Sequence, residues 1–232
     1  MQFSFMEFFS FPLDKHMNIC LNVHTTYERS FICSSDRKVV FSVYRIAALA
    51  IQALFYGFYL AKLLIQKRQR IRTNQMGTGR NPAKVLRIER IMCVATVLTL
   101  AVSVGSILLA GPAAHTGMRI AGFAAGVLAV LFFAAATITM KTSWRVGIPE
   151  EKTALVTNGV YHISRNPAFV GFDLLYLSAC LLFPNLPLTL CALFAAVMLH
   201  LQILKEEEHL LRVFGPEYAG YMQQVRRYIG KK

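Results

Sequence analysis

Residues 169–204 read FVGFDLLYLSACLLFPNLPLTLCALFAAVMLHLQIL, two apolar runs joined by the short segment PNLP. Pro184 and Pro187 end the helices on either side of this segment, because proline lacks the N–H that a helix interior needs. The run 186–204 is close to the roughly 20 residues that a bilayer requires, and the run 169–183 is shorter. We therefore predict a helical hairpin in a membrane.

Three further apolar runs precede the hairpin, over residues 43–65, 91–110 and 118–140. The chain of 232 residues is 16% charged, whereas a soluble domain carries roughly 25% charged residues. The sequence therefore predicts an all-α integral membrane bundle of about five transmembrane helices. The predicted divisions are an interfacial or loosely ordered extension (1–40), three transmembrane helices (41–140), and a second half that contains the hairpin (141–232).

Basic residues gather after the first, the third and the fifth apolar run. With five spans, these three regions lie on one side of the membrane, and basic connections face the cytoplasm. We therefore expect an outer N-terminus and a cytoplasmic C-terminus, with a bacterial inner membrane as the location and the lipid bilayer as the surroundings. This placement also explains the net charge of +13, so no nucleic-acid partner is expected.

The five cysteines do not show the spacing of metal ligands. Cys93, Cys180 and Cys191 lie in apolar runs and are expected to be small residues that face the core or the lipid. Cys20 and Cys33 lie in the N-terminal extension and could pair if it faces an oxidising compartment. The sequence predicts no metal site.

Two segments that flank the hairpin carry the polar residues typical of a binding site. The first, 144–171, contains SRNPAF at 164–169; the second contains EEEHL at 206–210 and FGPEY at 214–218. Both lie on the predicted cytoplasmic side. Because a hairpin brings its two ends together, the segments should lie close in space.

The pattern G-x-Y-x-x-x-R-[HN]-P-x-[YF]-x-G, then a hairpin, then E-E-x-x-L-x-x-x-F-G-x-x-Y, resembles the isoprenylcysteine carboxyl methyltransferase family. Phospholipid N-methyltransferases share much of it. The resemblance covers residues 144–228. It implies an S-adenosylmethionine-dependent enzyme with a lipid-like or isoprenylated substrate, either a small molecule or a protein. Its cytoplasmic cofactor site would be formed by residues 144–171 and the C-terminal tail.

The same resemblance implies roles for individual residues. Arg165 and Glu207 would be catalytic, and Glu206 would accept hydrogen bonds from the cationic cofactor, as an ionised acceptor should. Pro167 is expected to restrict Asn166 to extended geometry, which would leave backbone groups free to face a ligand. The cofactor pocket would be lined by Leu155, Val156, Tyr161, Asn166, Pro167, Ala168 and Phe169.

Three positions depart from the family pattern. Asn166 and Phe169 stand where histidine and tyrosine are usual. Gln202 would contact the substrate, but it stands where the carboxyl methyltransferases commonly have an arginine that holds a carboxylate. The substrate is therefore open between a carboxylate and an amine, and an amine must first lose a proton. Candidate bases are Glu207, His162 and His209.

Two other classes of function remain open. Membrane sterol reductases share a similar turn and C-terminal half but bind NADPH. A non-enzymatic membrane protein would use Arg165 as a basic residue near lipid headgroups and the three glutamates as a solvated helix face. The pairing of the two motifs favours the methyltransferase. Trp144 is expected to be an interface anchor.

Overall fold

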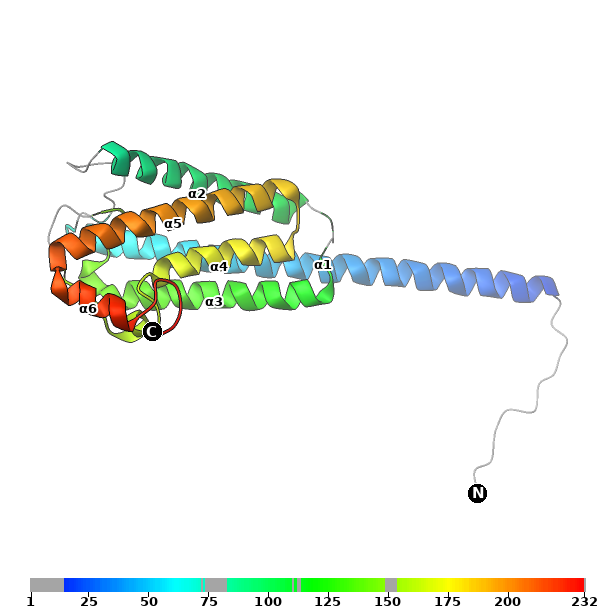
Figure 1. Cartoon of the computed structure of the whole chain (residues 1–232). Helices are drawn as coiled ribbons and strands as arrows, with labels where there is room; N and C mark the ends of the chain where they lie inside the picture. Colours follow the sequence, from blue (N-terminus) through cyan, green and yellow to red (C-terminus); the bar gives the residue numbers. More distant parts are fainter. Residues whose placement is uncertain are drawn as a thin grey trace, which may run out of the picture. The chain divides into compact units, whose positions relative to one another are not determined.

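The computed structural model describes residues 15–71, 73, 83–109, 111, 114–148 and 154–231, and these are helical apart from the connections. The chain divides into two units, Met1–Tyr44 and Arg45–Lys232. In the first unit the structure describes the helical backbone from Lys15 and the side chains from Phe41. A pairing of Cys20 with Cys33 lies outside the described side chains, and the predicted divisions of the chain stay a prediction. The elements are α1 (Lys15–Arg68), α2 (Ala83–Leu109), α3 (Thr116–Met140), the 3-10 turns η1 (Lys141–Ser143) and η2 (Gly159–His162), α4 (Pro167–Leu182), α5 (Leu186–Phe214) and α6 (Pro216–Gln224) (Figure 1).

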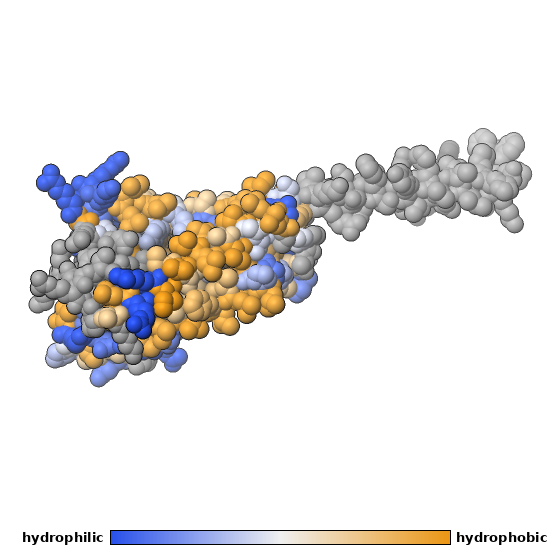
Figure 2. Space-filling model, turned by 90° about the horizontal axis from the view of Figure 1, so that it is seen from above, coloured by the Kyte–Doolittle hydropathy of each residue, from blue (hydrophilic) through white to orange (hydrophobic). Residues whose placement is uncertain are grey.

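Four helical segments are long and apolar enough to cross a membrane, namely Phe41–Arg68, Val85–Leu109, Thr116–Ser143 and Leu186–Phe214. Helix α4 has only 16 residues, about 24 Å at 1.5 Å per residue, against a hydrocarbon core of about 30 Å. Hydrophobic side chains cover the flank of the described helices, and hydrophilic ones collect mainly at the end that carries α6 (Figure 2). The chain is a multi-pass membrane protein of the all-α class.

Helix α3 packs along α4, and α2 packs along α5 (Figure 1). A Cβ atom at Gly171 would lie 3.1 Å from the carbonyl oxygen of Ala129, and one at Gly126 would lie 2.8 Å from Ser178 Oγ. Small residues at such crossings let membrane helices approach closely. Helix α1 packs against α3 through aromatic contacts, since the centre of the Phe55 ring lies 4.5 Å from that of the Phe133 ring.

The connection between α4 and α5 is the tight turn predicted from its prolines. Asn185 caps α5 by accepting a hydrogen bond from the Leu188 N–H at 2.9 Å, and its Nδ2 donates to Ser106 Oγ of α2 at 3.0 Å. The predicted helical hairpin is therefore confirmed. The end of α1, the start of α2, the turn η2 and α6 lie at the opposite end, where the two motif segments meet (Figure 1).

Candidate cofactor site

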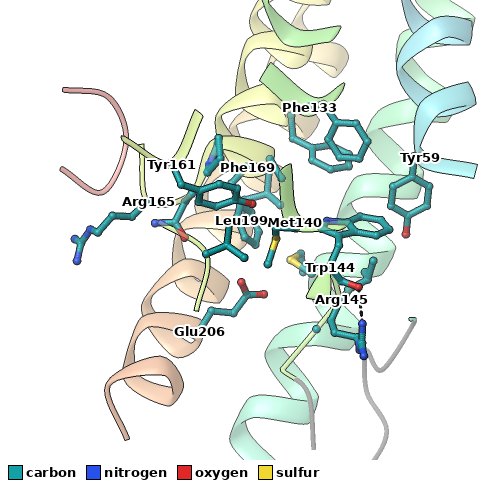
Figure 3. Close-up of a pocket in the computed structure, with 18 of the residues that line it drawn as sticks. Tyr59, Phe133, Met140, Trp144, Arg145, Tyr161, Arg165, Phe169, Leu199 and Glu206 are labelled. Atoms are coloured by element: carbon teal, nitrogen blue, oxygen red, sulfur yellow. Dashed lines mark hydrogen bonds between the residues drawn. The ribbon is translucent and has the colours of Figure 1, made fainter. Parts of the chain in front are cut away.

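A cavity of about 440 Å³ lies at this end of the bundle, with walls from all six α-helices and from the residues between α3 and α4 (Figure 3). Its volume falls within the roughly 300–1,000 Å³ of small-molecule sites. Of the residues predicted for the site, Gln202 and Glu207 do not line the cavity. Those that do are Leu155, Val156, Tyr161, Arg165, Asn166, Pro167, Ala168, Phe169 and Glu206.

Residues 163–166, between η2 and α4, are called the motif turn below, and backbone hydrogen bonds hold this part of the cavity wall. Pro167 is the first residue of α4, where a missing N–H costs nothing. Asn166 has φ −131° and ψ 52°, so the expected extended geometry is wrong. Its N–H donates to Ser164 Oγ at 3.1 Å, and its carbonyl accepts from the Val170 N–H at 3.1 Å as α4 starts. These backbone groups are therefore used within the fold rather than free for a ligand.

Three tyrosines from η2 and α6 form an aromatic wall. Tyr221 Oη donates to the carbonyl oxygen of Tyr161 at 2.6 Å. Tyr218 is 1% exposed, and its hydroxyl has no hydrogen-bond partner among the described residues. Burial raises the pKa of all three side chains. They therefore stay neutral near pH 7, and the Tyr218 hydroxyl is available as a donor or acceptor for a ligand.

The charged residues among the described lining residues are Arg145, Arg165 and Glu206. Both arginine side chains extend away from the Glu206 carboxylate, which points into the cavity (Figure 3). Arg145 Nη1 donates to the carbonyl oxygen of Thr142 at 2.6 Å. Among the described residues, Glu206 is thus the one charged group directed into the cavity. Such a site suits a cation.

Glu207 points to the other side of the motif turn and lies in a buried ion network. It is 5% exposed, and Arg165 Nη2 lies 3.1 Å from its Oε1. Arg227 Nε and Nη2 donate to its Oε2 at 3.0 and 2.9 Å, which raises the pKa of Arg227. The structure thus brings the two predicted catalytic residues together as an ion pair, and their catalytic role stays a prediction.

Gln202 is fully buried and lies outside the cavity lining. Its Nε2 donates to Glu206 Oε1 at 3.0 Å and lies 3.5 Å from Glu89 Oε1. Glu89 Oε1 also accepts from the Ile148 N–H at 2.9 Å. Glu89 was missed because no motif marks it, although it shares the buried stripe of α2 with Met92, three residues on.

Trp144 is buried rather than at the membrane interface, so the predicted anchor role is wrong. It is 5% exposed, and its ring packs edge-on against Tyr59 at 5.8 Å and Phe133 at 6.2 Å. The cavity also runs between α1 and α2 as far as Leu60 and Val97, which are 55% and 61% exposed. It therefore reaches the lipid-facing surface, a feature that motifs do not reveal.

Comparison with known proteins supports the motif interpretation. No curated protein matches the chain. The family model described as phospholipid methyltransferase matches residues 118–217, which run from α3 into α6. The matched segment includes the motif turn, the hairpin and Glu206. The resemblance predicted from the motifs is thereby confirmed, since residues 118–217 are similar to the phospholipid methyltransferase family.

Proposed function

We propose that this protein is an S-adenosylmethionine-dependent membrane methyltransferase that binds the cofactor in the cavity and methylates a lipid-like acceptor. One observation carries the proposal. Within the segment that matches the phospholipid methyltransferase model, Glu206 is the one charged group among the described residues that is directed into an aromatic-walled cavity.

The residues of the cavity fit the chemistry of this cofactor. Its sulfonium cation suits a carboxylate such as Glu206 and the faces of aromatic rings. Leu155, Val156 and Phe169 offer apolar and aromatic surface to an adenine. The Tyr218 hydroxyl is a buried polar group without a partner among the described residues, and it would hydrogen-bond the polar end of the ligand.

When bound, the cofactor supplies a methyl group whose bond to sulfur breaks as the bond to the acceptor forms in line. The protein contributes orientation and the exclusion of water. The turn that starts α4 and the carboxylate of Glu206 face each other across the cavity (Figure 3). They would hold the donor between them, and an acid–base triad is not required.

The charges of the cavity favour an amine acceptor over the isoprenylcysteine carboxylate. Gln202 is buried outside the cavity. Arg145 and Arg165 line the cavity, but their side chains extend away from Glu206. An ammonium group beside Glu206 would therefore be attracted to its carboxylate, whereas a carboxylate acceptor would be repelled by it. Glu206 would then accept the proton that the ammonium must lose. This favours a phospholipid N-methyltransferase, with the carboxyl O-methyltransferase as the second candidate.

The proposed orientation is an outer N-terminus and a cytoplasmic C-terminus in a bacterial inner membrane. It is supported by basic residues at the described ends of helices on the cavity side of the bundle, such as Arg68 at the end of α1, Lys141 after α3 and Arg212 near the end of α5. A reporter enzyme that works only in the cytoplasm should be active when it is fused after Lys232. Activity of a reporter that works only on the other side of the membrane would contradict the orientation.

The opening between α1 and α2 gives the acceptor a way in from the bilayer. We expect Val97→Trp to lower methyl transfer to lipid roughly fivefold or more, because a larger ring overfills the opening. Binding of S-adenosylhomocysteine should stay within about twofold of the wild type, as for a surface substitution. The assay follows labelled methyl groups from the donor into extracted lipids.

Val94→Trp is the matched control for this prediction. Val94 also lies on α2 and is 67% exposed, but it does not line the cavity. It should transfer methyl groups like the wild type. Equal losses in both variants would mean that the opening is not the route of the acceptor.

Titration calorimetry of the purified protein with S-adenosylhomocysteine and with NADPH tests the proposed function. Binding of S-adenosylhomocysteine without binding of NADPH is expected. Binding of NADPH alone would replace the proposal with the reductase class, and binding of neither would favour a non-enzymatic protein.

A further inference from the structure

Residues 225–231, which follow the family-matched segment, fold back over the motif turn and are called the C-terminal strap below. Val225 and Lys231 form an antiparallel bridge that closes the strap on itself. The Gly230 N–H donates to the carbonyl oxygen of Ile163 at 2.8 Å, and the Arg165 N–H donates to that of Arg226 at 3.1 Å. The strap is therefore bonded to the turn on both of its arms.

Arg227 ties the strap to both motif segments at once. Its guanidinium donates twice to the buried Glu207 of α5. Its carbonyl oxygen accepts from Asn166 Nδ2 at 3.2 Å and lies 3.4 Å from the Ser164 hydroxyl. Asn166 Nδ2 also donates to Glu207 Oε1 at 3.1 Å. One strap residue thus joins the start of α4 to the end of α5.

Glu207, the residue that this junction holds, is the neighbour of Glu206 on α5. Successive residues of a helix are turned by about 100°, at 3.6 residues per turn. Glu207 is held by Arg165 of the turn before α4 and by Arg227 of the strap, while Glu206, the residue before it, faces the cavity (Figure 3). The same bonds hold Asn166, the residue before the first turn of α4. Phe169 lies in that turn and lines the cavity.

We propose that Arg227 is a positioning residue of the cofactor site. It does not line the cavity; through Glu207 and Asn166 it sets the orientation of Glu206 and of the facing turn. The inference rests on the proposed function, and it extends the site to a part of the chain beyond the segment that the family match covers.

The test measures S-adenosylhomocysteine affinity in the full-length protein. Arg227→Ala should weaken binding roughly tenfold or more, because the buried Glu207 carboxylate loses the partner that donates two hydrogen bonds to it. Arg227→Lys should recover part of the loss, because an ammonium group still pairs with Glu207 but without the two-pronged geometry. An alanine variant that binds like the wild type would overturn the proposal.

Two variants of the same strap are matched controls. Arg226→Ala removes an exposed side chain but keeps the carbonyl that accepts from Arg165. Tyr228→Phe removes the 2.6 Å hydrogen bond to His200 Nδ1 on α5. Both should bind within about twofold of the wild type. If all three variants lose affinity in parallel with their melting temperatures, the strap only stabilises the fold and the proposal fails.

A double-mutant cycle with Glu207→Gln tests the path of the effect. If Arg227 acts through Glu207, then Arg227→Ala should cause little further loss of affinity in the Glu207→Gln background. Fully additive losses would overturn the proposed path. A wild-type protein that fails to bind S-adenosylhomocysteine would instead refute the proposed function, and this inference with it.

Discussion

Replacing Glu206 by glutamine should weaken the binding of S-adenosylhomocysteine and of the methyl donor roughly 10- to 100-fold, the cost of losing hydrogen bonds to a charged group. The donor should be affected more, because its sulfonium is cationic and the product is not. The carbonyl oxygen of the new side chain can still accept the 3.0 Å hydrogen bond from Gln202. The packing of α5 is therefore kept while the charge is lost, and calorimetry measures the change.

Glu208→Gln is the control for this prediction. Glu208 lies on the same helix and pairs at 2.7 Å with Lys205 in an exposed salt bridge, so it should bind both ligands within about twofold of the wild type. Unchanged affinity in Glu206→Gln would remove the central residue of the proposed site. An equal loss in both variants would point to a general effect of charge at this end of the bundle.

Replacing Glu207 by alanine should destabilise the protein by about 3–5 kcal/mol, the cost of leaving a buried charge without its partner. The Arg165 side chain is 5% exposed and would lose Glu207 as its ion-pair partner. Arg227 is 34% exposed and can turn to water, so the larger part of the cost falls on Arg165. Equilibrium unfolding of the purified protein in detergent measures this change.

Glu217→Ala serves as the comparison, since Glu217 is exposed in the first turn of α6. Its removal should change the free energy of unfolding by no more than about 0.5 kcal/mol. If Glu207→Ala were equally mild, the network around Glu207 would not be stabilising the turn. The positioning role of Arg227 would then lose its physical basis.

The helical core of this fold could be predicted from the sequence because its signals are local. Apolar run length marks the spans, and Pro184 and Pro187 mark the turn of the hairpin. That hairpin alone implies that the motif turn and Glu206 share one end of the bundle. The prediction of a short fourth helix follows from the same run lengths.

The rest of the site depends on contacts that sequence patterns do not encode. Arg227 and Glu207 are 20 residues apart, with no helical spacing to relate them. Trp144 was misplaced because an aromatic residue at the end of a span fits an interface as well as a core. Gln202 was expected to face the substrate, yet it is fully buried and hydrogen-bonded to Glu206. Its place in the sequence motif does not reveal whether its side chain points into the cavity or into the packed core.

The shortness of α4 has a consequence for where the reaction takes place. Irregular chain is tolerated at membrane depth only where protein covers it, and the turn before Pro167 meets this condition, since Ser164, Arg165 and Asn166 are all buried. Helix α4 starts short of the cavity-side ends of α3 and α5, which leaves a recess in the helical bundle (Figure 1). Under the proposed function, a water-soluble donor can descend to the level of a lipid's headgroup, so that the acceptor is methylated without being lifted out of its leaflet.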